Sequence, residues 1–209
     1  EPGLVTCMKT IGFSFDLHPP LFMIVFVILC GITCFILKRR KANMTVKQLF
    51  FVATTIFYSL SVVKLTLLPI TISFDKTSYP DMPWKYYYQL IPFQTIISAW
   101  KQGNLLQVVG NIVLLLPLPI LIGLLKKRST GFFRILTVVI SVSLGIELTQ
   151  LLINCLTGIP NKVADVDDFI LNSIGGLVGW ATIKLYFVLI REKKDQSFHL
   201  PNSADNSTN

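Results

Sequence analysis

Residues 21–41 read LFMIVFVILCGITCFILKRRK, an apolar run that ends directly in four basic residues. A helix rises about 1.5 Å per residue, so the apolar part of this run is just long enough to cross the bilayer hydrocarbon, which is about 30 Å thick. Lysine and arginine are enriched at the cytoplasmic ends of transmembrane helices. The stretch therefore predicts a transmembrane helix over residues 21–37 whose C-terminal end lies in the cytoplasm.

Four further apolar blocks follow, over residues 46–72, 105–125, 132–156 and 169–190. Of the 209 residues, 52% are hydrophobic and only 14% are charged, whereas a soluble domain carries about 25% charged residues. This composition excludes an ordinary cytosolic enzyme, a disordered chain and a secreted disulfide scaffold. The sequence predicts an all-α membrane protein with about five transmembrane helices.

The blocks divide the chain into three predicted parts. Residues 1–45 hold an additional N-terminal transmembrane helix and a basic loop, residues 46–190 form a four-helix membrane domain, and residues 191–209 form a polar, disordered tail. Between the second and third spans, residues 79–103 are rich in Trp and Tyr, whose amphipathic rings favour the headgroup level. We expect a short interfacial segment there, on the outer surface.

The distribution of charge predicts the orientation and the location. The net charge is +8, and 13 of the 19 basic residues flank the apolar blocks on one side, five lie on the other, and Lys64 lies within a block. The positive-inside rule places the richer side in the cytoplasm, so the N-terminus is expected outside and the C-terminus inside. Because topology accounts for the basic residues, we expect membrane lipids and no nucleic acid as partners.

Two ionisable residues, Lys64 and Glu147, lie inside predicted spans. Each costs about 2.5–3.5 kcal/mol on insertion scales and is a functional candidate by default. Both are expected roughly 12–14 Å below the outer surface, which invites an ion pair. In the alternative, Lys64 extends its amine to the surface while Glu147 is protonated or capped by a hydroxyl.

Polar residues repeat on one face of three predicted helices, at intervals of three and four. These stripes are Asn104, Gln107 and Asn111; Ser143, Glu147, Gln150 and Asn154; and Asp165, Asp168, Asn172, Gly175 and Gly179. They predict one polar cavity that opens outward between spans two to five. Its candidate functional residues are Lys64, Asn111, Glu147, Gln150, Asp165, Asp168 and Asn172.

Each stripe also has a purely structural interpretation. Polar residues join membrane helices, and Gly175 and Gly179 form a close-packing motif, the role we assign to both. Asp168 alone would serve as an N-cap, but Asp165, Asp167 and Asp168 beside Glu147 exceed what capping requires. Pro117 and Pro119 predict a bend or break in span three. Because His18 and His199 are outside these stripes, we expect no metal and no cofactor.

Four segments together resemble the VanZ-like family of bacterial membrane proteins. They are LIPFQTI at 90–96, GNIVLLLP at 110–117, SLGIELTQ at 143–150 and DVDDFILNSIGG at 165–176. The resemblance covers about residues 46–189, with Lys162 where an arginine often precedes the aspartates. It implies a multi-pass protein of the bacterial plasma membrane and an association with resistance to teicoplanin and related lipoglycopeptides.

Three functions stay open on this basis. The first is non-enzymatic binding of an envelope precursor or lipoglycopeptide at the outer face, and we rank it first. The second is an intramembrane enzyme acting on a lipid-linked envelope substrate, with Glu147 as general base or as a ligand to Mg²⁺ or Mn²⁺ and with Asp165 and Asp168 as its partners; no nucleophile motif supports it. The third is a small transporter with Lys64 and Glu147 as a relay, although five spans without an inverted repeat make this less attractive.

Overall fold

A computed structural model describes residues 12–40, 45–73 and 83–198. Within these residues, five helices are long and apolar enough to cross a membrane: Pro19–Arg39, Val46–Leu67, Leu106–Lys126, Phe132–Thr157 and Val166–Glu192. The predicted all-α membrane fold with five spans is therefore confirmed. The expected tail from 199 to 209 lies outside the described residues.

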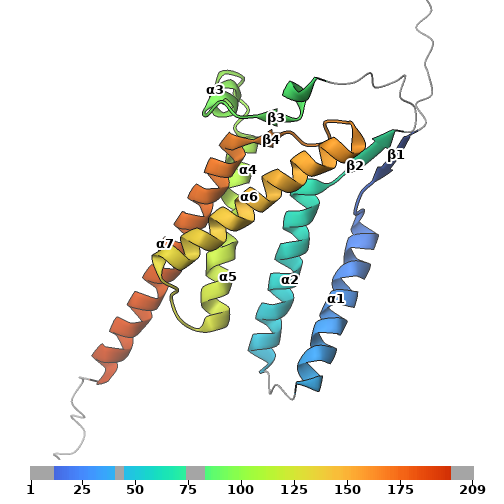
Figure 1. Cartoon of the computed structure of the whole chain (residues 1–209). Helices are drawn as coiled ribbons and strands as arrows, with labels where there is room; N and C mark the ends of the chain where they lie inside the picture. The colour runs from blue at the N-terminus through green and yellow to red at the C-terminus, as the bar shows by residue number, and fades with distance from the viewer. Residues whose placement is uncertain (1–11, 41–44, 74–82, 199–209) are drawn as a thin grey trace, which may run out of the picture.

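The described elements follow one another as short strands and long helices (Figure 1). In order they are β1 (Gly12–Phe15), α1 (Pro19–Arg39), α2 (Val46–Leu67), β2 (Ile70–Ser73), the 3-10 turn η1 (Trp84–Tyr86), β3 (Tyr88–Gln89), α3 (Gln94–Lys101), α4 (Leu106–Leu115), α5 (Pro117–Lys126), α6 (Phe132–Thr157), β4 (Ala164–Asp165) and α7 (Val166–Phe198).

Two span boundaries differ from those expected. Span two ends at Leu67 rather than at 72, because residues 70–73 form β2 and pair antiparallel with β1. An apolar strand and the end of an apolar helix have the same hydropathy, so composition alone does not separate them. Helix α7 runs to Phe198 rather than ending at 190, so the start of the expected disordered tail is helical.

Local sequence signals account for several helix ends. Helix α2 begins with a capping box: Thr45 Oγ1 accepts the Gln48 N–H at 3.3 Å, and Gln48 Oε1 accepts the Thr45 N–H at 3.0 Å. Helix α6 ends at Gly158, whose φ of 67° is the left-handed conformation that glycine adopts easily.

The proline-containing span is divided, as predicted. Helix α4 ends at Leu115 and α5 starts at Pro117, while Leu116 keeps helical dihedral angles (φ −57°, ψ −42°). The two helices therefore follow each other without a loop. Proline lacks an N–H and leaves a carbonyl in the preceding turn without its helical donor. In this region Tyr58 Oη of α2 donates to the Leu114 carbonyl at 2.9 Å.

Helix α7 packs on α4, α5 and α6, while α1 contacts α2 on the opposite side of the bundle (Figure 1). A Cβ added at Gly175 would overlap the Ile112 carbonyl oxygen, and one at Gly179 would overlap the Leu116 carbonyl oxygen. Both positions therefore exclude any side chain. The apolar core beside them consists of Leu115, Ile135, Val139 and Ile146.

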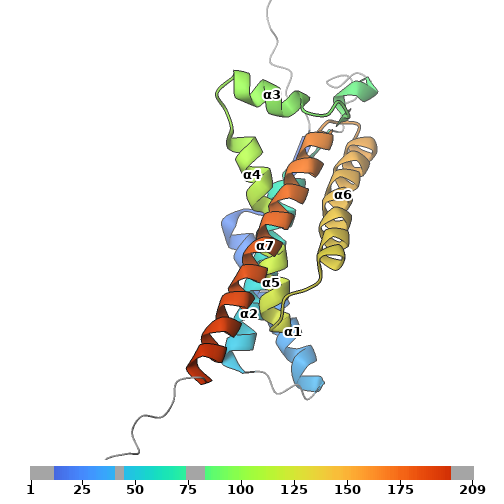
Figure 2. The same cartoon turned by 90° about the vertical axis from the view of Figure 1, so that its left-hand side faces the viewer.

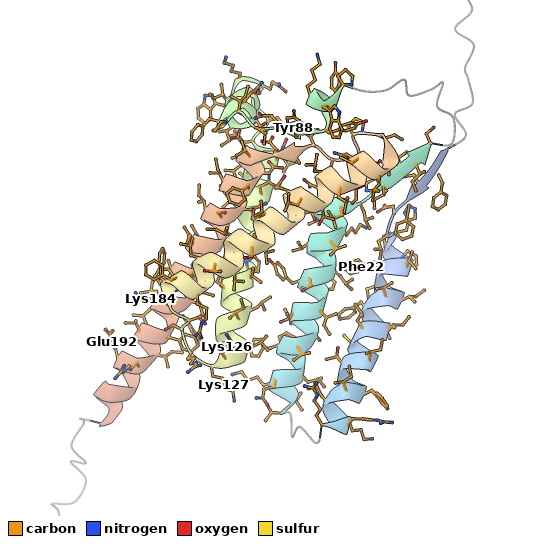
Figure 3. The ribbon with its side chains drawn as sticks, in the orientation of Figure 1. Phe22, Tyr88, Lys126, Lys127, Lys184 and Glu192 are labelled. Atoms are coloured by element: carbon orange, nitrogen blue, oxygen red, sulfur yellow. The ribbon has the colours of Figure 1, made fainter. Side chains whose placement is uncertain are left out.

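The strands and α3 gather at one end of the bundle, here called the α3 end (Figures 1 and 2). There β3 pairs parallel with β4, with Tyr88 opposite Ala164 and Gln89 opposite Asp165. Figure 3 shows Tyr88 at this end and Lys126 and Lys127 toward the opposite one. The β3–β4 pairing joins the segment after span two to the start of α7, where the acidic motif lies.

Candidate functional site

A polar cavity of about 500 Å³ lies among α2, α4, α6 and the start of α7. Its lining brings together residues that are far apart in sequence. The polar ones are Thr66, Gln107, Asn111, Gln150, Asn161, Lys162, Asp165 and Asp168. Of the seven candidate residues, Asn111, Gln150, Asp165 and Asp168 thus line one cavity, whereas Lys64, Glu147 and Asn172 are not part of its lining.

Asp168 is the carboxylate that links α7 to α4 across this cavity. Its Oδ1 accepts a hydrogen bond from Asn111 Nδ2 and a longer one, of 3.4 Å, from Gln107 Nε2. Asp168 is half-buried. Two amide side chains on successive turns of α4 therefore hold one oxygen of Asp168, and the carboxylate borders the cavity.

Glu147 lies one helical turn from Gln150 on α6 and is only 8% exposed. Its Oε2 accepts the Asp165 backbone N–H at 2.8 Å, while its Oε1 is buried and has no hydrogen-bond partner among the described residues. Buried polar atoms are normally paired. Glu147 is thus capped by a backbone amide, and its second oxygen remains an acceptor without a donor.

Gln150 and Asn172 each also have a buried side-chain oxygen without a hydrogen-bond partner among the described residues. Gln150 Nε2 donates to the Thr66 carbonyl at 3.0 Å, but Gln150 Oε1 is buried with no partner in the described part of the chain. Asn172 is 1% exposed, and its Oδ1 is likewise unpartnered within that part. The polar stripes on α6 and α7 thus contain three buried acceptor oxygens to which no described residue donates.

Of the two alternatives for Lys64 and Glu147, the ion pair does not form. Within the described residues the sole ion pair is His18 with Asp16, at 3.8 Å. Lys64 is half-buried in the last turn of α2. The cation that borders the cavity is instead Lys162, from the loop between α6 and β4.

Asp165 and Asp167, unlike Asp168, both bond to the N-terminal region of α3. Asp167 is fully buried, and its two oxygens accept the backbone N–H groups of Phe93 at 2.5 Å, Thr95 at 2.8 Å and Ile96 at 3.2 Å. It therefore caps the N-terminus of α3 from a distant helix. Asp165 accepts the Thr95 hydroxyl at 2.5 Å and the Asp167 N–H at 2.8 Å, so it fixes the same junction.

Asn154 holds the loop that carries Lys162. Its Nδ2 donates to the carbonyls of Lys162 at 2.6 Å and Tyr87 at 3.3 Å, and its Oδ1 accepts the Asn161 N–H at 2.9 Å. Asn161 in turn bonds to the backbone of Thr71 in β2: its Oδ1 accepts the Thr71 N–H, and its Nδ2 donates to the Thr71 carbonyl. Asn154 thus has a structural role in positioning Lys162.

Sequence reasoning did not identify Asn161 or Lys162 as site residues. Both lie in the short loop before the acidic motif, outside any helical stripe, so periodicity gives no signal for them. No group of three or more His, Cys, Asp or Glu side chains arranged to hold a metal ion is found in the part of the chain that the structure describes.

A protein-family model described as VanZ/LLP1 matches residues 50–189. The match includes α2 from its second turn and α7 as far as Leu189, together with every residue that lines the polar cavity. It confirms the resemblance carried by the four sequence segments. Neither the curated proteins nor the solved structures compared with this chain include a match.

Proposed function

The chain belongs to the VanZ/LLP1 family, and on that premise we propose that its polar cavity faces the outside of a bacterial plasma membrane. There it binds an envelope precursor or a lipoglycopeptide such as teicoplanin, without altering it chemically. This binding contributes to resistance.

The charge distribution supports the orientation. Lys38 and Arg39 end α1, Lys126 ends α5 and Lys127 follows it. The positive-inside rule assigns these helix ends to the cytoplasm. The α3 end, with the polar cavity near it, then lies outside, where cell-wall precursors and glycopeptides meet.

One observation carries the choice of binding over catalysis: among the described residues, the lining of the polar cavity combines hydrogen-bonding groups with a cation and includes no nucleophile–base pair. Asp168 and the Gln150 oxygen can accept hydrogen bonds from a ligand, while the Lys162 amine can donate them. A peptide or sugar portion of an envelope molecule offers hydroxyl and amide N–H donors as well as carbonyl acceptors. The mixed lining suits such a ligand.

The test is drug sensitivity in a deletion strain complemented with variants. We expect deletion to increase sensitivity to teicoplanin, wild-type chain to restore resistance, and Asp168→Ala to fail to restore it. Gln102→Ala is the matched control, because Gln102 is an exposed polar residue near the α3 end that does not line the cavity. Equal complementation by Asp168→Ala and the wild type would remove this cavity from the mechanism.

Vancomycin, tested in parallel, separates the two ligand classes. Protection against teicoplanin alone favours recognition of the lipid-tailed drug, whereas protection against both favours a shared envelope precursor. Lipid and precursor analysis of the same strains tests the alternative, an intramembrane enzyme with Glu147 and Asp168 as acidic groups. If the amount of a lipid or precursor species depended on Glu147, the result would favour an enzyme over a binding protein.

A further inference from the structure

A second cavity, here called the basic cavity, lies at the loop between α5 and α6 and measures about 520 Å³. It shares no lining residue with the polar cavity. Three cationic side chains border it, and the described residues of its lining include no carboxylate. Its cationic and hydroxyl residues are Lys126, Arg128, Ser129, Thr130 and Arg134.

The N-terminus of α6 adds backbone donors to this positive region. The helix has 26 residues, and its N-cap is Gly131, so no side chain caps the first turn. The first N–H groups of a helix have no partner within the helix, and they carry the positive end of its dipole. Gly131, Phe132 and Phe133 all border the cavity. Such a terminus is a favourable place for a phosphate group.

Thr130 supplies an independent indication of a ligand. It is 8% exposed and borders the cavity, and its hydroxyl oxygen is buried with no partner in the described part of the chain. Its backbone carbonyl accepts the Trp180 Nε1–H of α7 at 2.9 Å. The loop is therefore anchored, while the buried hydroxyl has no hydrogen-bond partner among the described residues and is available to a ligand.

The neighbouring aromatic side chains indicate where that ligand comes from. Phe133 is 79% exposed beside the cavity, and Phe132 packs edge-on against Trp180 with 5.1 Å between ring centroids. Both helices that the loop joins belong to membrane spans. An exposed phenylalanine at the end of a span favours contact with lipid chains. The headgroup of that lipid would lie at the level of the basic loop.

We propose that the basic cavity binds the phosphate headgroup of an anionic phospholipid. Arg128 and Arg134 contact the phosphate with their guanidinium groups, and Lys126 adds positive charge. The α6 N-terminus and the Thr130 hydroxyl donate to the remaining oxygens. This site is separate from the proposed function of the polar cavity, since it uses none of the same residues. Figure 3 shows Lys126 at the end of α5, where the loop begins.

The test measures lipid binding to the purified full-length chain in neutral detergent by native mass spectrometry. We expect phosphatidylglycerol to be retained about tenfold more strongly than phosphatidylcholine, and Arg128→Gln/Arg134→Gln to lose about tenfold of that affinity. The matched control is Arg39→Gln/Arg40→Gln, which removes the same charge at the end of α1, away from the cavity. An equal loss in the control would overturn the proposal in favour of diffuse attraction.

Thr130→Val keeps the proposal testable if the arginine variant does not fold. Valine matches the shape of threonine without the unpartnered oxygen, so melting in lipid-free detergent should be unchanged or raised. The stabilisation by phosphatidylglycerol should fall. Stabilisation equal to the wild type's would count against a site at Thr130. Competition with inorganic phosphate distinguishes the source: displacement of the lipid at low millimolar phosphate would replace the headgroup by a soluble phosphate ligand.

Discussion

Docking of α3 depends on the carboxylate of Asp167, and Asp167→Ala tests this directly. The helix itself has no buried residue, and its Ile97 and Trp100 are 51% and 73% exposed. Apolar burial therefore contributes little to its position. Three backbone N–H groups at its N-terminus donate to Asp167 from α7. Truncation of this one side chain leaves all three donors without their acceptor.

The expected magnitude follows from those three bonds. At about 1 kcal/mol for each, a low value because α3 is exposed to solvent, the free energy of local opening falls by about 3 kcal/mol. This corresponds to about a hundredfold faster exchange. Hydrogen–deuterium exchange on the full-length chain should show this increase for residues 93–101. Exchange in α6 should not change, because none of the three bonds involves α6.

Two variants make the measurement specific. Asp167→Asn keeps one acceptor oxygen and should give an intermediate increase in exchange. Asp168→Ala is the matched control, because the adjacent carboxylate bonds to Gln107 and Asn111 of α4 rather than to α3. Unchanged exchange of residues 93–101 in Asp167→Ala, or an equal increase in Asp168→Ala, would refute the capping role.

Two further substitutions test the packing of α7 and the divided span. Gly179→Ala places a methyl group against the Leu116 carbonyl and should destabilise the chain by about 1–3 kcal/mol. The measurement is the melting temperature in detergent, which should fall. Gly145→Ala is the control, because a methyl group there meets open space and should leave the melting temperature unchanged. Tyr58→Phe removes the donor to the Leu114 carbonyl and should lower stability by about 1 kcal/mol; Tyr86→Phe, at an exposed position, is its control.

The five spans could be predicted because the transfer of a helix into lipid depends mainly on composition and length. The division at Pro117 could also be predicted, since a proline lacks the N–H that a helix requires. The ends of two spans could not be predicted. Residues 70–73 are as apolar as the helix before them, yet they pair with β1. The polar end of α7 remains helical to Phe198 because loss of hydropathy does not end a helix.

The polar stripes predicted which residues of α4, α6 and α7 share a face, because helical periodicity alone determines this. They did not determine how each helix is rotated toward its neighbours. Lys64 and Glu147 were placed at matching depth, but depth carries no information on rotation, and the two do not pair. The lysine that borders the polar cavity is Lys162, not Lys64, and it lies in a loop that Asn154 holds by a hydrogen bond.

The neighbouring aspartates of the acidic motif have two roles, one in holding α3 and one at the polar cavity. Adjacent residues on a helix point about 100° apart, so Asp167 and Asp168 reach different partners: Asp167 is occupied by α3, and Asp168 borders the polar cavity beside α4. Loss of function in an Asp167 variant would therefore report a displaced α3, whereas loss in an Asp168 variant with α3 still protected would report on the cavity. Hydrogen exchange and drug sensitivity, measured on the same two variants, separate a scaffold defect from a binding defect.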